Sequence, residues 1–169
     1  MIRLNRLRSF VSALAASAGL LVAVSGASAE WKAAVDSQYG TRVAYPTHIF
    51  RPLPLEPDAM DRRFESADGR AQMSIAAYAF PDAGDVHALK ARLLEDPQYA
   101  NLTYEAGGRS WFVLSGYRGS DIYYEKIMVT CGGDLVSAFG ITYPVEDRHR
   151  YDWIVERVED SFRPGRRCP

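Results

Sequence analysis

One run of aromatic and basic residues in the sequence could support binding chemistry. Tyr117, Arg118, Tyr123, Tyr124 and Lys126 fall on one predicted strand and on the turn before it. Aromatic rings beside cationic groups can hold a carbohydrate, a peptide or an anionic small molecule. The candidate ligand-binding residues are therefore Tyr117, Arg118, Tyr124 and Lys126.

The same residues also have a purely structural interpretation, which we favour over ligand binding. Successive side chains of a strand point to opposite faces of the sheet. Alternate members of the run would then belong to the core. The others, such as Tyr124 and Lys126, would form cross-strand pairs on a hydrophilic face.

Histidine does most acid–base work near neutral pH, but the three histidines of this chain are isolated. His48 lies in a proline-flanked loop, whereas His87 and His149 fall at the start of predicted helices. We interpret all three as solvent-exposed polar residues. A zinc site needs several His or Cys residues at characteristic spacing, so we expect neither a metal site nor a cofactor.

Serine and carboxylate chemistry is equally weakly supported. A serine nucleophile is usually marked by a Gly-x-Ser-x-Gly turn, which is missing around Ser115 and Ser120. Charged residues on strands and turns usually serve solvation and edge protection. We interpret four carboxylates in this way and predict no catalytic residue: Glu65, Asp68, Asp121 and Glu125.

The first 29 residues have the pattern of a secretory signal peptide. Three arginines precede a nearly uncharged run at residues 10–24, and the Ala-Ser-Ala triplet at residues 27–29 fits a cleavage site. A transmembrane anchor is the alternative, but the apolar run falls short of the roughly 20 residues that a spanning helix needs. We expect cleavage before Glu30, which leaves one domain at residues 30–169 in the periplasm or outside the cell.

Cleavage would remove Arg3, Arg6 and Arg8 but no acidic residue. The predicted mature chain then has 17 basic and 21 acidic residues, a formal net charge of −4. Such a chain has no basic stripe to neutralise phosphates or to bind an anionic membrane surface. We therefore expect no nucleic-acid partner and, with the apolar run removed, no membrane span in the mature chain.

Both cysteines, Cys131 and Cys168, belong to the predicted mature chain. An even number of cysteines in an exported protein favours a disulfide. This bridge would join the end of a central strand to the tail that follows the last helix. Two free thiols or a redox pair are the alternatives, and the chain lacks the Cys-x-x-Cys motif of a redox pair.

Residues 110–144 organise the predicted fold as three antiparallel strands. Residues 111–117, 121–131 and 135–143 are rich in aromatic and branched side chains, and glycine turns separate them. Together they form two consecutive hairpins.

Alternation along the middle strand separates its two faces. Tyr123, Ile127, Val129 and Cys131 share the face that we predict to be core. Because Cys168 must reach Cys131, we expect the last helix to cover that face.

The remaining strands are predicted from shorter patterns. A first strand covers residues 41–45, and a hairpin with an Asp-Gly turn joins residues 62–66 to residues 70–80. Residues 51–61 contain three prolines and predict a surface loop. A short strand at residues 101–106 would point Leu102 and Tyr104 inward, and residues 30–40 fit either a brief helix or an extended edge segment.

Two helices complete the fold. Asp85 is the expected N-cap of a helix that ends before Pro97. Asp147 is the expected cap of a second helix, which has an apolar stripe and stops at residues 164–165. The order of strand, hairpin, helix, meander and helix predicts the α+β class, with an antiparallel β-sheet and two main helices packed on it.

Several segments resemble a group of small exported bacterial proteins of uncharacterised function. They are VAYPTHIF at residues 43–50, ESADGRAQMS at 65–74, WFVLSGYRGSDIYYEK at 111–126, ITYP at 141–144 and YDWIVERVEDSFRP at 151–164. The element order is also similar to the PsbP/Mog1-like α/β/α sandwich. That resemblance implies an accessory or binding protein rather than an enzyme, and it places no functional residue in this chain.

The sequence thus predicts a non-enzymatic, exported binding or accessory protein of the bacterial cell envelope. Its partner, a protein or a small molecule of the envelope, is unknown. An envelope hydrolase with an unrecognised carboxylate or histidine site is the alternative, and a purely structural or stress-related protein is a third possibility. An enzyme should have a deep pocket in which titratable groups converge, whereas a binding module should expose an aromatic or apolar patch.

Overall fold

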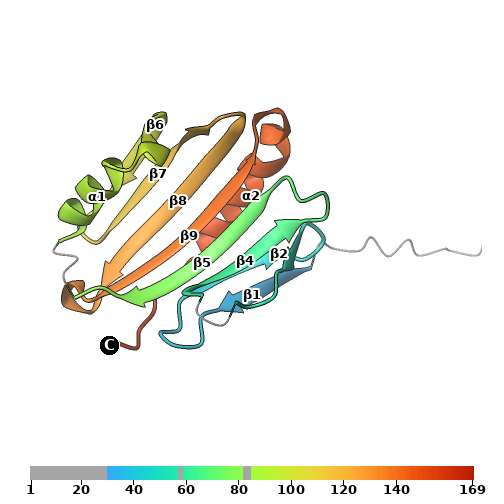
Figure 1. Ribbon diagram of the computed structural model, residues 1–169. Coiled ribbons are helices and arrows are strands. Elements are labelled where there is room, and N and C mark those ends of the chain that lie inside the picture. Colours follow the sequence, from blue (N-terminus) through green and yellow to red (C-terminus); the bar gives the residue numbers. More distant parts are fainter. Residues whose placement is uncertain (1–29, 57–58, 82–84) are drawn as a thin grey trace, which may run out of the picture.

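The computed structural model describes residues 30–56, 59–81 and 85–169. The predicted signal peptide at residues 1–29 lies outside the described residues. Figure 1 shows a broad antiparallel sheet with a helix on each side. Among the described residues, neither helix is both long enough and apolar enough to cross a bilayer.

The main sheet has seven strands, and every neighbouring pair is antiparallel. In chain order they are β3 (Phe50–Pro52), β4 (Asp61–Ser66), β5 (Gln72–Ala79), β6 (Leu102–Gly107), β7 (Trp111–Arg118), β8 (Asp121–Thr130) and β9 (Leu135–Pro144). Their order across the sheet is β3-β4-β5-β9-β8-β7-β6. The predicted meander and the predicted hairpin are therefore confirmed, and β9 joins them at the centre of the sheet.

The N-terminal part of the chain differs from the prediction in two places. The first predicted strand is β2 (Arg42–Pro46), which pairs with β1 (Trp31–Val35) in a separate two-stranded sheet. The predicted loop at residues 51–61 begins with two residues of β3, because that short strand pairs with β4 before Pro52 ends it.

Both predicted helices are present, but only one has the predicted cap. Helix α1 (Val86–Leu94) begins after Asp85, whose carboxylate accepts hydrogen bonds from the backbone N–H groups of His87 and Ala88. Helix α2 (Arg148–Ser161) follows the 3₁₀ turn η3 (Val145–Asp147), and Asp147 makes no side-chain cap bond. Its carboxylate instead accepts a hydrogen bond of 2.6 Å from Arg70, so a tertiary ion pair replaces the expected cap.

The two helices cover opposite faces of the sheet. Helix α1 and the 3₁₀ turn η1 (Pro97–Tyr99) pack on the face of β8 that carries Tyr123 and Ile127, here called the α1 face. Helix α2 and strand β2 pack on the opposite face, which carries Ile122 and Tyr124 and is here called the α2 face. The resulting three layers form an α/β/α sandwich.

This arrangement corrects the prediction that the last helix covers the Tyr123 face. The prediction extended strand alternation as far as Cys131. The structure ends β8 at Thr130, and Cys131 has a φ of 55° in the 3₁₀ turn η2 (Cys131–Gly133). Alternation no longer applies there, and Cys131 packs beside Tyr39 and Leu135 on the α2 face.

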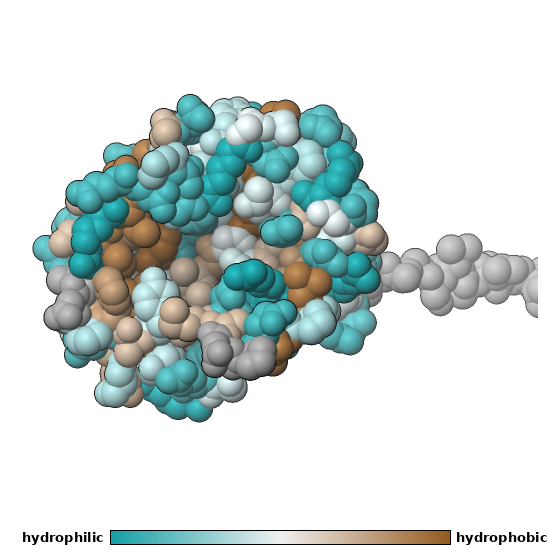
Figure 2. Space-filling model, viewed as in Figure 1, coloured by the Kyte–Doolittle hydropathy of each residue, from teal (hydrophilic) through white to brown (hydrophobic). Residues whose placement is uncertain are grey.

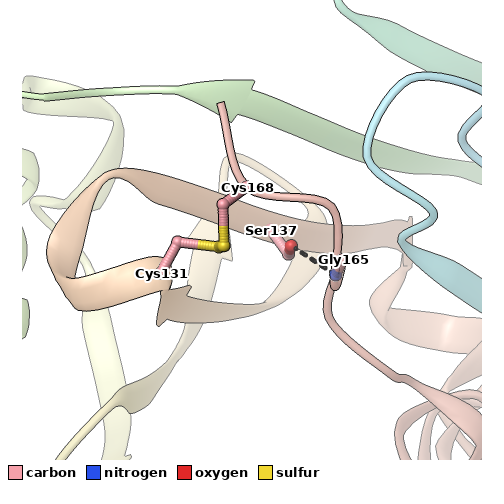
Figure 3. Close-up of a disulfide and its surroundings, with 4 residues drawn as sticks. All are labelled: Cys131, Ser137, Gly165 and Cys168. Carbon is pink, nitrogen blue, oxygen red and sulfur yellow. Dashed lines mark hydrogen bonds between the residues drawn. A yellow bond between two sulfur atoms is a disulfide. The ribbon is translucent and has the colours of Figure 1, made fainter.

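The C-terminal tail returns to the end of the sheet. Cys168 forms a disulfide with Cys131, with 5.6 Å between their Cα atoms. Figure 3 shows the tail running past β9, where the Gly165 N–H donates a hydrogen bond of 3.1 Å to Ser137 Oγ. Because a Cβ at Gly165 would lie 2.8 Å from the Tyr39 carbonyl oxygen, only glycine lets the tail approach this closely.

Part of the α1 face is left uncovered by both helices of the described residues (Figure 1). The side chains there are small and half-buried: Ser74, Ala76, Ala138 and Thr142, with Gly140 between the last two. Figure 2 shows this area as a shallow, pale hollow beside the brown apolar surface next to α1. The pocket described below lies on the α2 face, which this view does not show.

Candidate functional site

A pocket of about 420 Å³ lies between α2 and the edge of the sheet formed by β6, β7 and β8. It is on the α2 face, where the ends of these strands extend beyond the main core. Tyrosines form much of its wall, and α2 closes it with charged side chains. The lining residues that matter below are Tyr104, Tyr117, Tyr124, Tyr143, Arg148, Asp152 and Glu156.

Two of the tyrosines are fixed by hydrogen bonds to α2. The Tyr143 hydroxyl donates to Asp152 Oδ1 at 3.0 Å, and the Tyr124 hydroxyl donates to Glu159 Oε2. Burial raises the pKa of both phenols above the ordinary value for tyrosine, and the hydrogen bonds to carboxylates raise it further. Both hydroxyls therefore stay neutral donors near neutral pH and hold this part of the wall in place.

The other two tyrosines expose their rings. Tyr104 is 55% exposed and Tyr117 is 37% exposed, whereas Tyr143 is only 3% exposed. Large side chains that are exposed at the mouth of a pocket can gain buried area when a ligand binds, so these two rings are its natural contact surface.

A β-bulge turns Tyr104 toward the pocket. Leu102 pairs with Gly116, but Tyr104 pairs with Ser115, so the register shifts by one residue between Leu102 and Tyr104. In an unbroken strand both side chains would point to the same face. The bulge instead leaves Leu102 packed in the core of the α1 face and places Tyr104 in the pocket, which corrects the prediction that both point inward.

Helix α2 contributes charged residues spaced four apart. Arg148, Asp152 and Glu156 therefore share one face of the helix. Arg148 Nε donates to Asp152 Oδ2 at 3.0 Å, and this hydrogen bond raises the pKa of the guanidinium. The Glu156 side chain is exposed, and its carboxylate has no hydrogen-bond or ion-pair partner within the described part of the chain.

The structure divides the four predicted ligand-binding residues between two faces. Tyr117 and Tyr124 line the pocket. Lys126 shares their face but donates to Glu159 Oε1 at 2.7 Å and lies 4.9 Å from the Trp111 ring centroid. Arg118 lies on the α1 face. A ligand-binding role for these residues stays a prediction.

Arg118 belongs to a compact cluster beneath η1. Its guanidinium donates to Glu125 Oε1 at 2.6 Å and lies 4.3 Å from the ring centroid of Tyr123, which is fully buried. The Tyr99 hydroxyl donates to the other oxygen of Glu125 at 2.6 Å. Burial and the charge of Glu125 raise the pKa of Tyr99. These contacts tie η1 to the sheet.

Sequence reasoning missed the contributions of Tyr104 and of Glu156 on α2. The aromatic ring of Tyr104 in β6 was visible in the sequence, but nothing there indicated the bulge. The four-residue spacing of Arg148, Asp152 and Glu156 was also visible, yet it is typical of any solvated helix face.

His48, His87 and His149 are exposed as predicted. No group of three or more His, Cys, Asp or Glu residues that could hold a metal occurs in residues 30–56, 59–81 and 85–169.

Comparison with known proteins bears on the fold. No protein-family model matches the sequence, and no curated protein does. The structure is similar to that of PsbP from Synechocystis sp. PCC 6803, with a TM-score of 0.60, 14% identity, and coverage of 86% of this chain and 99% of PsbP. It is also similar to the Ran-binding protein Mog1p of Saccharomyces cerevisiae, with a TM-score of 0.54, 9% identity, and coverage of 81% and 96%. The resemblance to the PsbP/Mog1-like sandwich is thus confirmed for the fold.

Proposed function

We propose that this chain is an exported binding or accessory protein of the bacterial cell envelope and that the tyrosine pocket is its binding site. One observation carries the proposal. Tyr104 and Tyr117 present exposed rings at a pocket in which two other lining tyrosines, Tyr124 and Tyr143, are already fixed by hydrogen bonds to α2. Rigid aromatic side chains on an ordered scaffold lose little entropy on binding.

Two further features support the cellular setting. The signal-peptide pattern of residues 1–29 favours export, and a disulfide persists best in an oxidising compartment. The fold is shared with a protein described as Ran-binding, which agrees with a binding role.

The alternative of an envelope hydrolase finds less support in the pocket. Asp152 and Glu156 lie one helical turn apart, which could suggest a pair of catalytic carboxylates. However, Asp152 already accepts hydrogen bonds from Tyr143 and Arg148. A general base needs a free carboxylate within reach of the proton that it removes, so only Glu156 is left for such a role.

Capture of partners from an envelope extract tests the proposal. Tyr104→Ala together with Tyr117→Ala should reduce specific capture at least about tenfold, because exposed aromatic anchors commonly dominate binding energy. The matched control is Leu94→Ala, since Leu94 is also 37% exposed but lies on α1, across the sheet. Thermal melting should show that both proteins remain folded. Equal capture by the tyrosine variant and the control would contradict the proposal.

A further inference from the structure

We infer that the tyrosine pocket binds an organic cation, namely a guanidinium or alkylammonium group of side-chain size. The inference deepens the proposed binding function and rests on it. It comes from the balance of charges around the pocket, from the two exposed rings and from the size of the pocket.

The charges around the pocket leave one carboxylate uncompensated. Arg148 and Asp152 neutralise each other through their hydrogen bond of 3.0 Å. Glu159, which does not line the pocket, is neutralised by Lys126 at 2.7 Å. Glu156 remains, so the lining residues carry a net charge of −1.

The nearest cation along the helix does not compensate Glu156. Arg157 lies 4.5 Å from the centroid of the Trp31 ring, which belongs to β1. Trp31 also packs against Trp153 with ring centroids 6.2 Å apart, so Arg157 is held at the β1 side of the helix. An incoming cation therefore meets a free carboxylate at the pocket.

The exposed rings favour the same class of ligand. The face of a tyrosine ring attracts a cation within about 6 Å of the ring centroid. Tyr104 and Tyr117 supply two such rings from neighbouring strands, opposite Glu156 on the helix. An anion, by contrast, would meet the unpaired carboxylate of Glu156, and the charge of Arg148 is already offset by Asp152.

The volume limits the size of the bound group. About 420 Å³ lies toward the small end of the roughly 300–1,000 Å³ range of ligand pockets. It suits one arginine-like or lysine-like group rather than a long polymer. Such a cation could come from a free small molecule or from a basic side chain of a partner protein.

Two probes with blocked, uncharged ends test whether the pocket selects a positively charged group. The purified protein is titrated with N-acetyl-arginine amide and with N-acetyl-citrulline amide, which has nearly the same shape but no charge. Chemical-shift changes of tyrosine ring signals report binding at the pocket. We expect the arginine probe to bind at least about tenfold more tightly, because hydrogen bonds to charged groups contribute the most. Equal affinities would overturn the inference.

Three variants locate the effect on binding. Glu156→Gln should remove most of the preference for arginine over citrulline. Asp160→Asn, which removes the same charge from an exposed position of α2 that does not line the pocket, should leave the preference unchanged. Tyr104→Leu should weaken arginine binding about two- to fivefold, the size of an exposed cation–π contact. A preference that survives Glu156→Gln would also overturn the inference.

A further titration distinguishes the two possible sources of the cation, a free small molecule and a side chain of a partner protein. A nine-residue peptide with one central arginine should bind at least about tenfold more tightly than the amide if a partner protein supplies the side chain. Equal affinity would assign the pocket to a free small cation.

Failure of this inference is distinguishable from failure of the proposed function. If envelope capture depends on Tyr104 and Tyr117 while citrulline binds as well as arginine, only the cation inference is wrong. If capture is independent of both tyrosines, the proposed function is wrong as well.

Discussion

Replacing Cys131 and Cys168 together by alanine should lower the free energy of unfolding by about 4 kcal/mol. The disulfide spans a sequence separation of 37 residues, and a closed loop of this length removes about that much entropy from the unfolded chain. The Tm should fall by roughly 10–15 °C. Urea unfolding and thermal melting of the variant and the parent measure both quantities.

Reductant supplies the control for this prediction. Reducing the parent protein should bring its stability close to that of the Cys131→Ala, Cys168→Ala variant, and the variant itself should not respond. If the parent and the variant differ by less than about 1 kcal/mol under oxidising conditions, the bridge does not constrain the chain in the way that the loop-entropy estimate requires.

Gly116→Ala should both destabilise the protein and damage the pocket. A Cβ at Gly116 would lie 2.2 Å from the Asn101 carbonyl oxygen and 2.9 Å from Leu102 Cα. Both are backbone atoms, so no side-chain rotation relieves the clash. Strand β6 must shift, and Tyr104 must move with it. We expect a loss of about 3 kcal/mol and weakened binding at the pocket, measured by urea unfolding and by titration.

Gly140→Ala is the matched control for this change. A Cβ at Gly140 would approach Glu125 Cγ at 3.3 Å, a side-chain atom at a tolerable distance rather than a backbone atom in close contact. Its cost in the free energy of unfolding should be clearly smaller, and the pocket should keep its ligand affinity. If Gly116→Ala is as stable as the parent and binds equally well, the bulge and its glycine do not position Tyr104.

The sequence predicted the parts of the fold that local patterns determine. Glycine turns and alternation located β7, β8 and β9, and Asp85 marked the start of α1 correctly. The assignment of faces was wrong because strand alternation was carried through Cys131, whose positive φ depends on the turn that follows β8. Asp147 occupies the predicted N-cap position of α2, but it makes no cap hydrogen bond because a distant residue, Arg70, binds its carboxylate.

The candidate site was only partly predictable for the same reason. Tyr117 and Tyr124 were identified from their residue types alone. Packing decides which of the four predicted residues lie on the α2 face of the sheet. Arg118 lies on the opposite face. The position of Tyr104 depends on a single bulge. Sequence periodicity does not indicate a one-residue shift in strand register.

Site-specific photocrosslinking in living cells tests most directly whether the tyrosine pocket is the binding site. Tyr117 is replaced by p-benzoylphenylalanine, which keeps an aromatic ring at the pocket, and Leu94 on α1 is replaced in a parallel strain. After irradiation, we expect a discrete crosslinked product from position 117 and little or none from position 94. A product from position 94 with none from position 117 would contradict the assignment of the pocket.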